Sequence, residues 1–417
     1  MSKISLLQTG DWHIDVAPSK APRNEDHRHF LKWMLKLMRE QQTEVLLHTG
    51  NIFHSSLPSH QGLLLLNDFI YEATKLPELK SMIFISGNHD PSQLMQSLTP
   101  LVRATDQVDV RFISQQPEAE HPTEDRFLIS VGTPGTKVTR ACIVALPYIP
   151  HPVLLSRYAS DKKSAIDRFL DVQKALRITY TTLAEQARSK HPQAPIIALG
   201  HFHCRDEETF PTALTSHRSI YFNRTFTPEL FCQNYDYVAL GHNQNVLSLD
   251  DGRIQYSGSP VTTSEEECSS RYVLKIEIGA SKKPQITRIE VPPFRSTISF
   301  EGSSLELLEL LDQLSETQTA YLYATITQST SHKELLKAID NHTAPVRLID
   351  LKHLEEKRYL NTDTSVPMMN PEQIFSEIYT QKYGSEPSQA LLDLLKKASE
   401  NAHAESTLST ATHSRIK

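Results

Sequence analysis

The most regular pattern in this chain is a short apolar run that ends in a glycine and polar side chains, and it occurs five times before residue 245. The runs cover Ile4–Leu7, Glu44–Leu47, Met82–Ile85, Pro195–Leu199 and Tyr237–Leu240, and the glycines that follow are Gly10, Gly50, Gly87, Gly200 and Gly241. Continuous apolar runs of this length predict strands buried on both faces. Because ligands in open α/β sheets bind at the carboxyl ends of strands, we expect the five strand ends to form one site.

Apolar residues at helical spacing separate these strands. The spacing predicts helices over residues 22–42, 60–76 and 163–189. Alternation over residues 271–278 predicts a half-exposed strand that closes a second sheet. With sheets on the inside and helices outside, the predicted fold is α/β, a four-layer α-β-β-α sandwich.

The character of the chain changes near residue 285. A strand at 286–293 ends in a proline pair and is typical of a linker, and Ser303 is a candidate N-cap for a leucine-rich helix. A strand at 320–326, a helix at 331–339 and a strand at 346–351 complete the pattern of a small α+β domain. The leucines of the first helix are expected to form the core of that domain.

Beyond residue 352 the sequence predicts only two short amphipathic helices, at 370–379 and 388–398, which are too small to form a core. The last residues are rich in Ser, Thr, Ala and His and are expected to be disordered. We therefore divide the chain into four parts: 1–284, 285–352, 353–398 and a tail at 399–417.

Composition narrows the class of protein. The chain has 417 residues, 39% apolar and 22% charged, which is typical of a globular protein. Its net charge of −6 excludes a wholly basic nucleic-acid coat, so any contact with DNA must come from a local patch. No apolar run approaches the roughly 20 residues of a membrane span. The four cysteines form no C-x-x-C pair, and the first residues resemble a strand more than a secretory signal, so we expect a reducing, cytoplasmic compartment.

The polar residues after the five runs indicate a chemistry. They offer carboxylate, amide and imidazole groups without thiolate, which suits Mn²⁺, Fe²⁺, Mg²⁺ or Zn²⁺. Two such ions about 3.5–4 Å apart can clamp the attacking and leaving oxygens of a phosphate ester. A single Gly-His or Gly-Asn after a strand is usually only a turn with a hydrogen-bonded side chain. Five together favour a metallophosphoesterase.

These segments resemble the metallophosphoesterase superfamily and, within it, the SbcD family, whose members are nuclease subunits of bacterial SbcCD complexes. The resemblance covers roughly the first 280 residues and extends more faintly into the C-terminal third. The residues that carry it are Gly10–His13, Gly50–Ser59, Gly87–Asp90, Leu146–Pro150, Gly200–His201, Tyr237–His242 and Tyr256–Pro260.

The resemblance implies roles for individual residues. Asp11 and His13 would hold a first metal ion, and Asn88, His201 and His242 a second. His89 would stabilise the transferring phosphate or protonate the leaving oxygen. His54 would lie near the scissile phosphate, although a surface turn residue is the alternative.

Three further residues carry weaker expectations. We expect Asp90 to orient His89 by a hydrogen bond. His48 and His203 have no counterpart in the family pattern, and a structural role is expected for both.

Two positions depart from the family pattern. Asn51 stands where the family has an aspartate that bridges both metals, and Gln244 stands where it has a histidine that binds the first. A neutral amide removes the anion that offsets repulsion between two divalent ions, an effect of several kcal/mol. An amide oxygen is also a weaker ligand than imidazole for most transition metals. We expect one metal at most, held by the second site, and Gln244 favours natural divergence over an engineered change at position 51.

The family also implies a cofactor and partners. The cofactor would be Mn²⁺, and the chain would cut DNA ends or hairpins together with an SbcC-type SMC-like ATPase bound through residues 353–398. Residues 285–352 would form a capping domain over the nuclease site, and the chain would form a homodimer. No Walker A pattern occurs, so any ATP dependence must come from the partner. The alternatives are a pseudo-nuclease that holds DNA ends as a scaffold, and a phosphoesterase for small substrates, against which the cap and tail argue.

Overall fold

The computed structural model of the chain describes most residues up to 353 and a few beyond. Contact clustering divides the chain into two compact units, residues 1–213 with 219–360 and residues 214–218 with 361–417. The described residues are 3–17, 23–102, 108–115, 125–132, 138–150, 153–154, 165–205, 225–261, 270–314, 320–327, 332–341, 346–353, 375–376, 379–380, 386–389 and 391–394.

The first sheet has six strands in the order β14-β13-β1-β2-β3-β4. Four of them are parallel neighbours, β1 (Ile4–Thr9), β2 (Val45–His48), β3 (Ser81–Ile85) and β4 (Asp109–Ile113). On the other side of β1 lies the antiparallel strand β13 (Arg271–Ile278), which pairs in turn with the antiparallel edge strand β14 (Gln285–Val291). The expectation that residues 271–278 close the second sheet is therefore wrong. The alternation of apolar and polar residues indicated that this strand has one buried face. It did not determine which neighbouring strand residues 271–278 would pair with.

The second sheet also has six strands, in the order β11-β12-β10-β7-β6-β5. Its central strands β6, β7, β10 and β12 are parallel, and the edge strands β5 and β11 run antiparallel. The bounds are β5 (Leu128–Gly132), β6 (Thr139–Ala145), β7 (Ile196–His201), β10 (Tyr237–Gly241), β11 (Leu247–Leu249) and β12 (Ile254–Tyr256).

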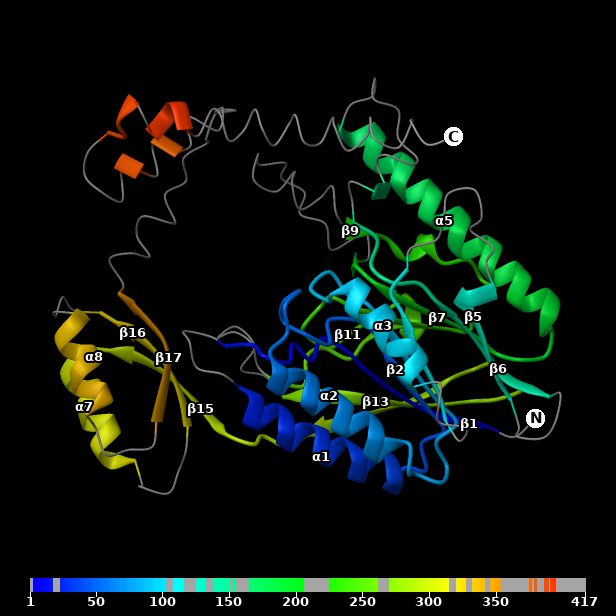
Figure 1. Ribbon diagram of the computed structural model, residues 1–417, viewed down its shortest axis with the longest axis horizontal. Helices are drawn as coiled ribbons and strands as arrows, with labels where there is room; N and C mark the ends of the chain where they lie inside the picture. Colours follow the sequence, from blue (N-terminus) through cyan, green and yellow to red (C-terminus); the bar gives the residue numbers. More distant parts are fainter. Residues whose placement is uncertain are drawn as a thin grey trace. The chain divides into compact units, whose positions relative to one another are not determined.

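Helices cover the outer face of each sheet, as Figure 1 shows for α1, α2 and α5. The helices of this part are α1 (Asn24–Glu40), α2 (His60–Ala73), α3 (Ser92–Val102) and α5 (Ala165–Lys190). One apolar cluster joins α1 and α2 to the first sheet, a second joins α5 to the second sheet, and a third lies between the sheets. Three cores between four layers confirm the predicted α-β-β-α sandwich.

A small separate sheet follows, built from three parallel strands with two helices and its own apolar core. Its elements are β15 (Ser296–Gly302), α7 (Ser304–Gln313), β16 (Ala320–Ile326), α8 (His332–Asp340) and β17 (Val346–His353). Ser303 caps α7 as expected, in a capping box with Glu306. The boundary we predict at residue 284 precedes β14, which belongs to the first sheet by its pairing. The first strand of the small domain is β15, and the sequence analysis did not predict it.

Short elements complete the described structure. They are β8 (His203–Cys204), β9 (Thr225–Phe226) and the 3-10 turns η2 (Asp125–Phe127), η4 (Pro228–Leu230) and η5 (Asp250–Gly252). Most of the predicted helices at 370–379 and 388–398, and the whole tail at 399–417, lie outside the described residues. In the second unit the amide of Leu392 donates to the carbonyl of Ser388, as in a helical turn. Within the part that the structure describes, no helix is long and apolar enough to cross a membrane.

Candidate active site

The loops at the carboxyl ends of five strands bring the predicted residues together. Asp11 and His13 follow β1, Asn51 and His54 follow β2, and Asn88 and His89 follow β3. His201 ends β7, while His242 and Gln244 follow β10. Contacts described below connect all nine, so the expectation of one assembled site agrees with the geometry.

Backbone strain marks these loops. Asp11 and His13 both have φ of 49°, Asn51 has 57° and His242 has 89°. Non-glycine residues with positive φ are uncommon, and such strain persists only where the surroundings fix it. Here the backbone amide of Asp11 donates to the carbonyl of Gly50 at 2.8 Å, and the backbone amide of His13 donates to the carbonyl of Asn51 at 3.0 Å. The loops after β1 and β2 therefore hold each other in place.

A glycine allows the third loop to approach equally closely. A Cβ added at Gly87 would lie 2.2 Å from Oδ1 of Asn51 and 2.4 Å from its backbone nitrogen. Both distances are shorter than any real contact, so only glycine fits here.

Hydrogen bonds determine the orientation of the Asn51 amide. The backbone N–H of His89 donates to Oδ1 of Asn51 at 3.1 Å. Because a backbone N–H is only a donor, the amide oxygen must face it. The Nδ2 group then donates to Oδ1 of Asp11 at 3.0 Å and to Oδ1 of Asn88 at 3.2 Å. Asn51 thus directs two hydrogens at oxygens that were predicted to bind metal.

The next step of this network leaves two acceptors facing each other. Nδ1 of His201 lies 2.7 Å from the carbonyl oxygen of Thr49 and must carry a hydrogen to bond it. Burial lowers the pKa of His201 well below its usual value, so the ring is neutral and Nε2 has a bare lone pair. That nitrogen lies 3.0 Å from Oδ1 of Asn88, which the Asn51 bond has already identified as oxygen. No hydrogen lies between them, and a divalent cation would satisfy both, so this donor set fits a metal ion.

Two more histidines adjoin His201. The His242 ring centre is 5.0 Å from that of His201, and the backbone N–H of His242 donates to Oδ2 of Asp11 at 2.8 Å. Burial and the nearby His203 lower the pKa of His242 to about 3. The His203 ring centre lies only 4.1 Å from that of His242, so a residue expected to be structural adjoins the candidate ligands. Its position two residues after His201 was the available signal.

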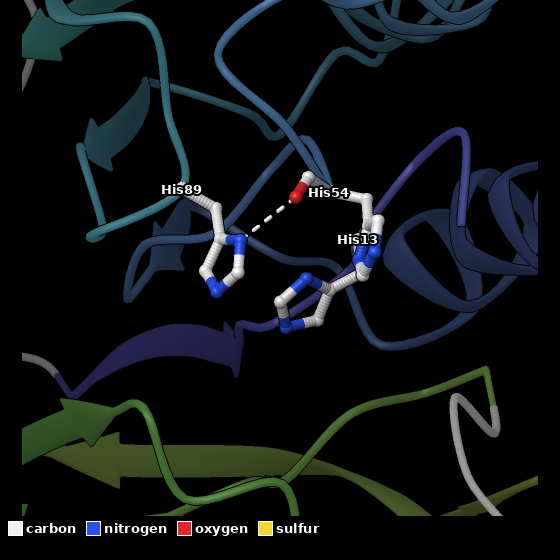
Figure 2. Close-up of side chains that lie close together, drawn as sticks. All are labelled: His13, His54 and His89. Atoms are coloured by element: carbon white, nitrogen blue, oxygen red, sulfur yellow. Dashed lines mark hydrogen bonds between the residues drawn. The ribbon is translucent and has the colours of Figure 1, made fainter. Parts of the chain in front are cut away.

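A second group consists of His13, His54 and His89, which Figure 2 shows side by side. Ring nitrogens of all three lie within 4.8 Å of one another. The His89 ring donates through Nδ1 to the carbonyl oxygen of His54 at 2.7 Å, and the amide nitrogen of Gln244 lies 3.3 Å from Nε2 of His13. Burial and the neighbouring histidines lower the pKa of His13 to about 3. His54 therefore adjoins the site, as its functional interpretation requires.

The expectation for Asp90 is wrong. Its buried carboxylate accepts hydrogen bonds from the backbone amides of Phe53 at 2.9 Å and Gly87 at 2.8 Å, whereas the His89 ring bonds to His54. Two oxygens facing two backbone donors fasten the loop after β3 to the loop after β2. Burial raises the pKa of this carboxyl group despite those bonds. An acid beside His89 in sequence suggested a partner for its ring, but backbone donors were closer.

Three groups that support the site were missed. The Thr49 carbonyl fixes the His201 ring, and the Ser259 hydroxyl donates to the carbonyl of Asp11 at 2.7 Å. Tyr148 contacts the His201 ring edge-on at 6.1 Å between centres. His48 is fully buried against Trp12 and accepts a hydrogen bond from the amide of Gly50 at 3.2 Å. Backbone carbonyls and hydroxyls leave no pattern in a single sequence, so none of these supports was predictable.

Comparison with known proteins places this geometry in context. The model of the calcineurin-like phosphoesterase family matches residues 4–244, the range that contains every predicted site residue. The SbcD protein of the nuclease SbcCD from Rhodobacter capsulatus is 25% identical over 357 residues, which cover 83% of this chain and 86% of that protein. The protein of the same name from Escherichia coli K12 is 23% identical over 367 residues, covering 85% and 86%. That from Staphylococcus epidermidis is 22% identical and covers 73% and 74%.

Proposed function

Because this chain belongs to the calcineurin-like phosphoesterase family, we propose that it is a metal-dependent phosphodiesterase that works as a DNA nuclease subunit of the SbcD kind. The observation that carries the proposal is the pair of facing acceptors, Nε2 of His201 and Oδ1 of Asn88, 3.0 Å apart. Such a pair is unfavourable unless a cation lies between its members. Relatives named as nuclease subunits that align over most of both chains support DNA as the substrate.

We propose Mn²⁺ as the ion, held by Asn88, His201 and His242. When bound, it would supply positive charge to a phosphate oxygen and lower the pKa of an attacking water. The chain's own residues do the rest. His89 and His54 lie beside this group and would position the scissile phosphate and give a proton to the leaving oxygen.

Asn51 and Gln244 limit the first metal position, where Asp11 and His13 would be the remaining strong ligands. Asn51 donates hydrogens to Asp11 and Asn88, so its amide competes with an ion for both oxygens. We therefore propose that the two metal positions of the family hold at most one ion between them in this chain, and a second candidate function follows. A pseudo-nuclease that binds DNA ends without cutting them is favoured by this internal hydrogen bonding.

The remaining parts of the chain have proposed roles as well. The domain of β15–β17 would act as the capping domain, with its boundary after β14, and residues 353–398 would bind an SbcC-type ATPase. Homodimer formation is proposed on the family resemblance. A cytoplasmic location is proposed on the family resemblance.

The decisive experiment compares cleavage by four versions of the chain, each purified with its ATPase partner and supplied with Mn²⁺. They are the unaltered chain, Asn51→Asp with Gln244→His, His89→Ala, and the restored double variant carrying His89→Ala. Substrates are a DNA hairpin, a blunt duplex and a small phosphodiester. If the unaltered chain is a nuclease, it cuts DNA and the His89→Ala variant is at least a hundredfold slower. Cleavage only by the restored double variant would identify a pseudo-nuclease, and cleavage of the small ester alone would exclude DNA.

A further inference from the structure

Three imidazole rings meet on one side of the site. His13 comes from the loop after β1, His54 from the loop after β2 and His89 from the loop after β3, and their ring nitrogens lie within 4.8 Å of one another. The rings of His54 and His89 are nearly parallel, at 21°, and the His13 ring is steeply inclined to both. Figure 2 shows the group.

Two of the rings have nitrogens that the hydrogen bonds among the described residues leave for another partner. Nδ1 of His89 donates to the His54 carbonyl, which leaves Nε2 as the ring nitrogen that can take another partner, the arrangement that orients histidines on metals. Nδ1 of His13 is buried, and among the described residues no group makes a hydrogen bond to it.

We propose that His13, His54 and His89 form a tri-histidine site for Zn²⁺ or a similar borderline ion, separate from the group of Asn88, His201 and His242. Three imidazoles with a fourth position open to water are a ligand set that Zn²⁺ takes in proteins. Nitrogens bound to one tetrahedral Zn²⁺ are about 3.4 Å apart, so the ring nitrogens must move closer by at most about 1.4 Å. His54 lies on the outer loop and is the least buried of the three, so rotation of its side chain can provide this movement.

The site has a consequence for activity that rests on the proposed function. His54 and His89 are the residues that we place at the scissile phosphate, so an ion held by their rings would block them. Zn²⁺ would then inhibit cleavage that Mn²⁺ supports.

The test is a Co²⁺ titration of the full-length chain followed by visible absorption, because tetrahedral Co²⁺ is strongly coloured and replaces Zn²⁺. The variant His54→Ala keeps the carbonyl that accepts from His89 but removes one ligand. We expect it to bind the coloured ion at least tenfold more weakly, whereas His201→Ala keeps that ion. His191→Ala is the matched control, a histidine after α5 whose ring bonds to Ser130, and it should leave the titration unchanged. Circular dichroism verifies that each variant folds. If His54→Ala does not fold, His54→Gln takes its place.

Unchanged affinity in a folded His54 variant would overturn the site, because the group around His201 does not include His54. Loss of the coloured ion in His201→Ala alone would overturn it as well. Failure of the nuclease assay would leave the titration untouched, and a normal nuclease without a coloured tetrahedral ion would refute only this inference. The two proposals therefore fail separately.

Discussion

The amide of Asn51 has partners on both of its ends, and each limits what the side chain can do. Its oxygen accepts from the backbone of His89, and its nitrogen donates to Asp11 and Asn88. An aspartate in the same position could keep the first bond, but it would place negative charge against Asp11. A single atom therefore decides whether the oxygens around it face a hydrogen or require a cation.

Gly87 provides a stability test at the same point. In the variant Gly87→Ala the new methyl group would overlap the backbone nitrogen of Asn51, which cannot move without displacing the loop after β2. We expect the free energy of unfolding to fall by about 1–3 kcal/mol, measured by urea denaturation. Gly279→Ala is the control, since its added Cβ meets nothing closer than 3.3 Å. Equal losses in the two variants would contradict the close approach.

The buried His48 predicts a dependence of stability on pH. Burial lowers its pKa from 6.5 to about 3, so between these values the unfolded chain binds a proton that the folded chain does not. Stability therefore rises with pH through this window and is lost as the pH falls below 6.5. The variant His48→Gln should reduce the slope of unfolding free energy between pH 4 and 6 by about 1.4 kcal/mol per pH unit. Identical slopes would show that His48 does not stay neutral.

Side chains that follow a strand and a glycine were predictable, because strand ends in α/β sheets converge on one edge. All nine predicted metal and catalytic residues lie there, from Asp11 to Gln244. The pairing of side chains was not predictable. Asp90 bonds to two backbone amides instead of His89, and His203 adjoins His242, because these contacts depend on where loops from different strands meet.

At the scale of elements, α1 connects the small domain to the site. Nη2 of Arg23, at the start of α1, donates to the hydroxyl of Tyr323 on β16 at 3.0 Å, and its guanidinium lies 4.0 Å from the centre of the Tyr321 ring. The Tyr321 hydroxyl donates to Asp26. One turn along α1, the His27 ring lies 2.6 Å from the carbonyl of Trp12, between Asp11 and His13. The small domain thus contacts the helix that supports the first loop of the site.

Removing one hydroxyl tests this connection. Arg23 is only 3% exposed, so the variant Tyr323→Phe leaves a buried charged donor without its acceptor. We expect the free energy of unfolding to fall by about 1.5–3 kcal/mol, as measured by urea denaturation. Tyr71→Phe is the control, because Tyr71 is 63% exposed and should change stability by less than about 0.5 kcal/mol. A Tyr323 variant as stable as this control would argue against a fixed connection.

The helices of the sandwich were easier to predict than the order of its strands. Helical stripes fix which face is buried, and α1, α2 and α5 lie within a few residues of their predicted bounds. Strand order depends on partners distant in sequence. Residues 271–278 pair with β1, some 270 positions earlier, and the alternation of Leu274, Ile276 and Ile278 is compatible with an edge in either sheet. For the same reason, the sequence analysis interpreted the residues of β14 as a linker and did not predict that they pair with β13.

At the scale of the whole molecule, the two sheets meet through a core to which both contribute. Ile4 and Leu6 of β1 belong to the same cluster as Ile197 of β7 and Ala239 of β10. Because this core lies directly below the loops, residues from the two halves of the chain face each other across the site. His201 of the second sheet can therefore bond to Thr49 of the first. The site exists only when both sheets have packed.

A chelator experiment tests whether the folded molecule needs an ion. In the unaltered chain Nε2 of His201 and Oδ1 of Asn88 face each other at 3.0 Å, and an ion bound there stabilises the folded state, so we expect chelator to lower the melting temperature. The variant Asn51→Asp would bring two carboxylates together, and its metal-free form should melt lower until a divalent ion is added. Calorimetry of both chains measures this. An unaltered chain that melts at the same temperature with and without chelator would contradict the expectation.

The bonds of Asn51 also have a kinetic meaning. An ion that approaches the oxygens of Asp11 and Asn88 finds them occupied, and it can bind both only after the amide has rotated away. Loading would then depend on the turning of one side chain as well as on the supply of metal. At low ion concentration such a molecule resists filling, because the amide competes with the ion for both oxygens. The Asn51 amide must therefore rotate away from Asp11 and Asn88 before an ion can bind both of them.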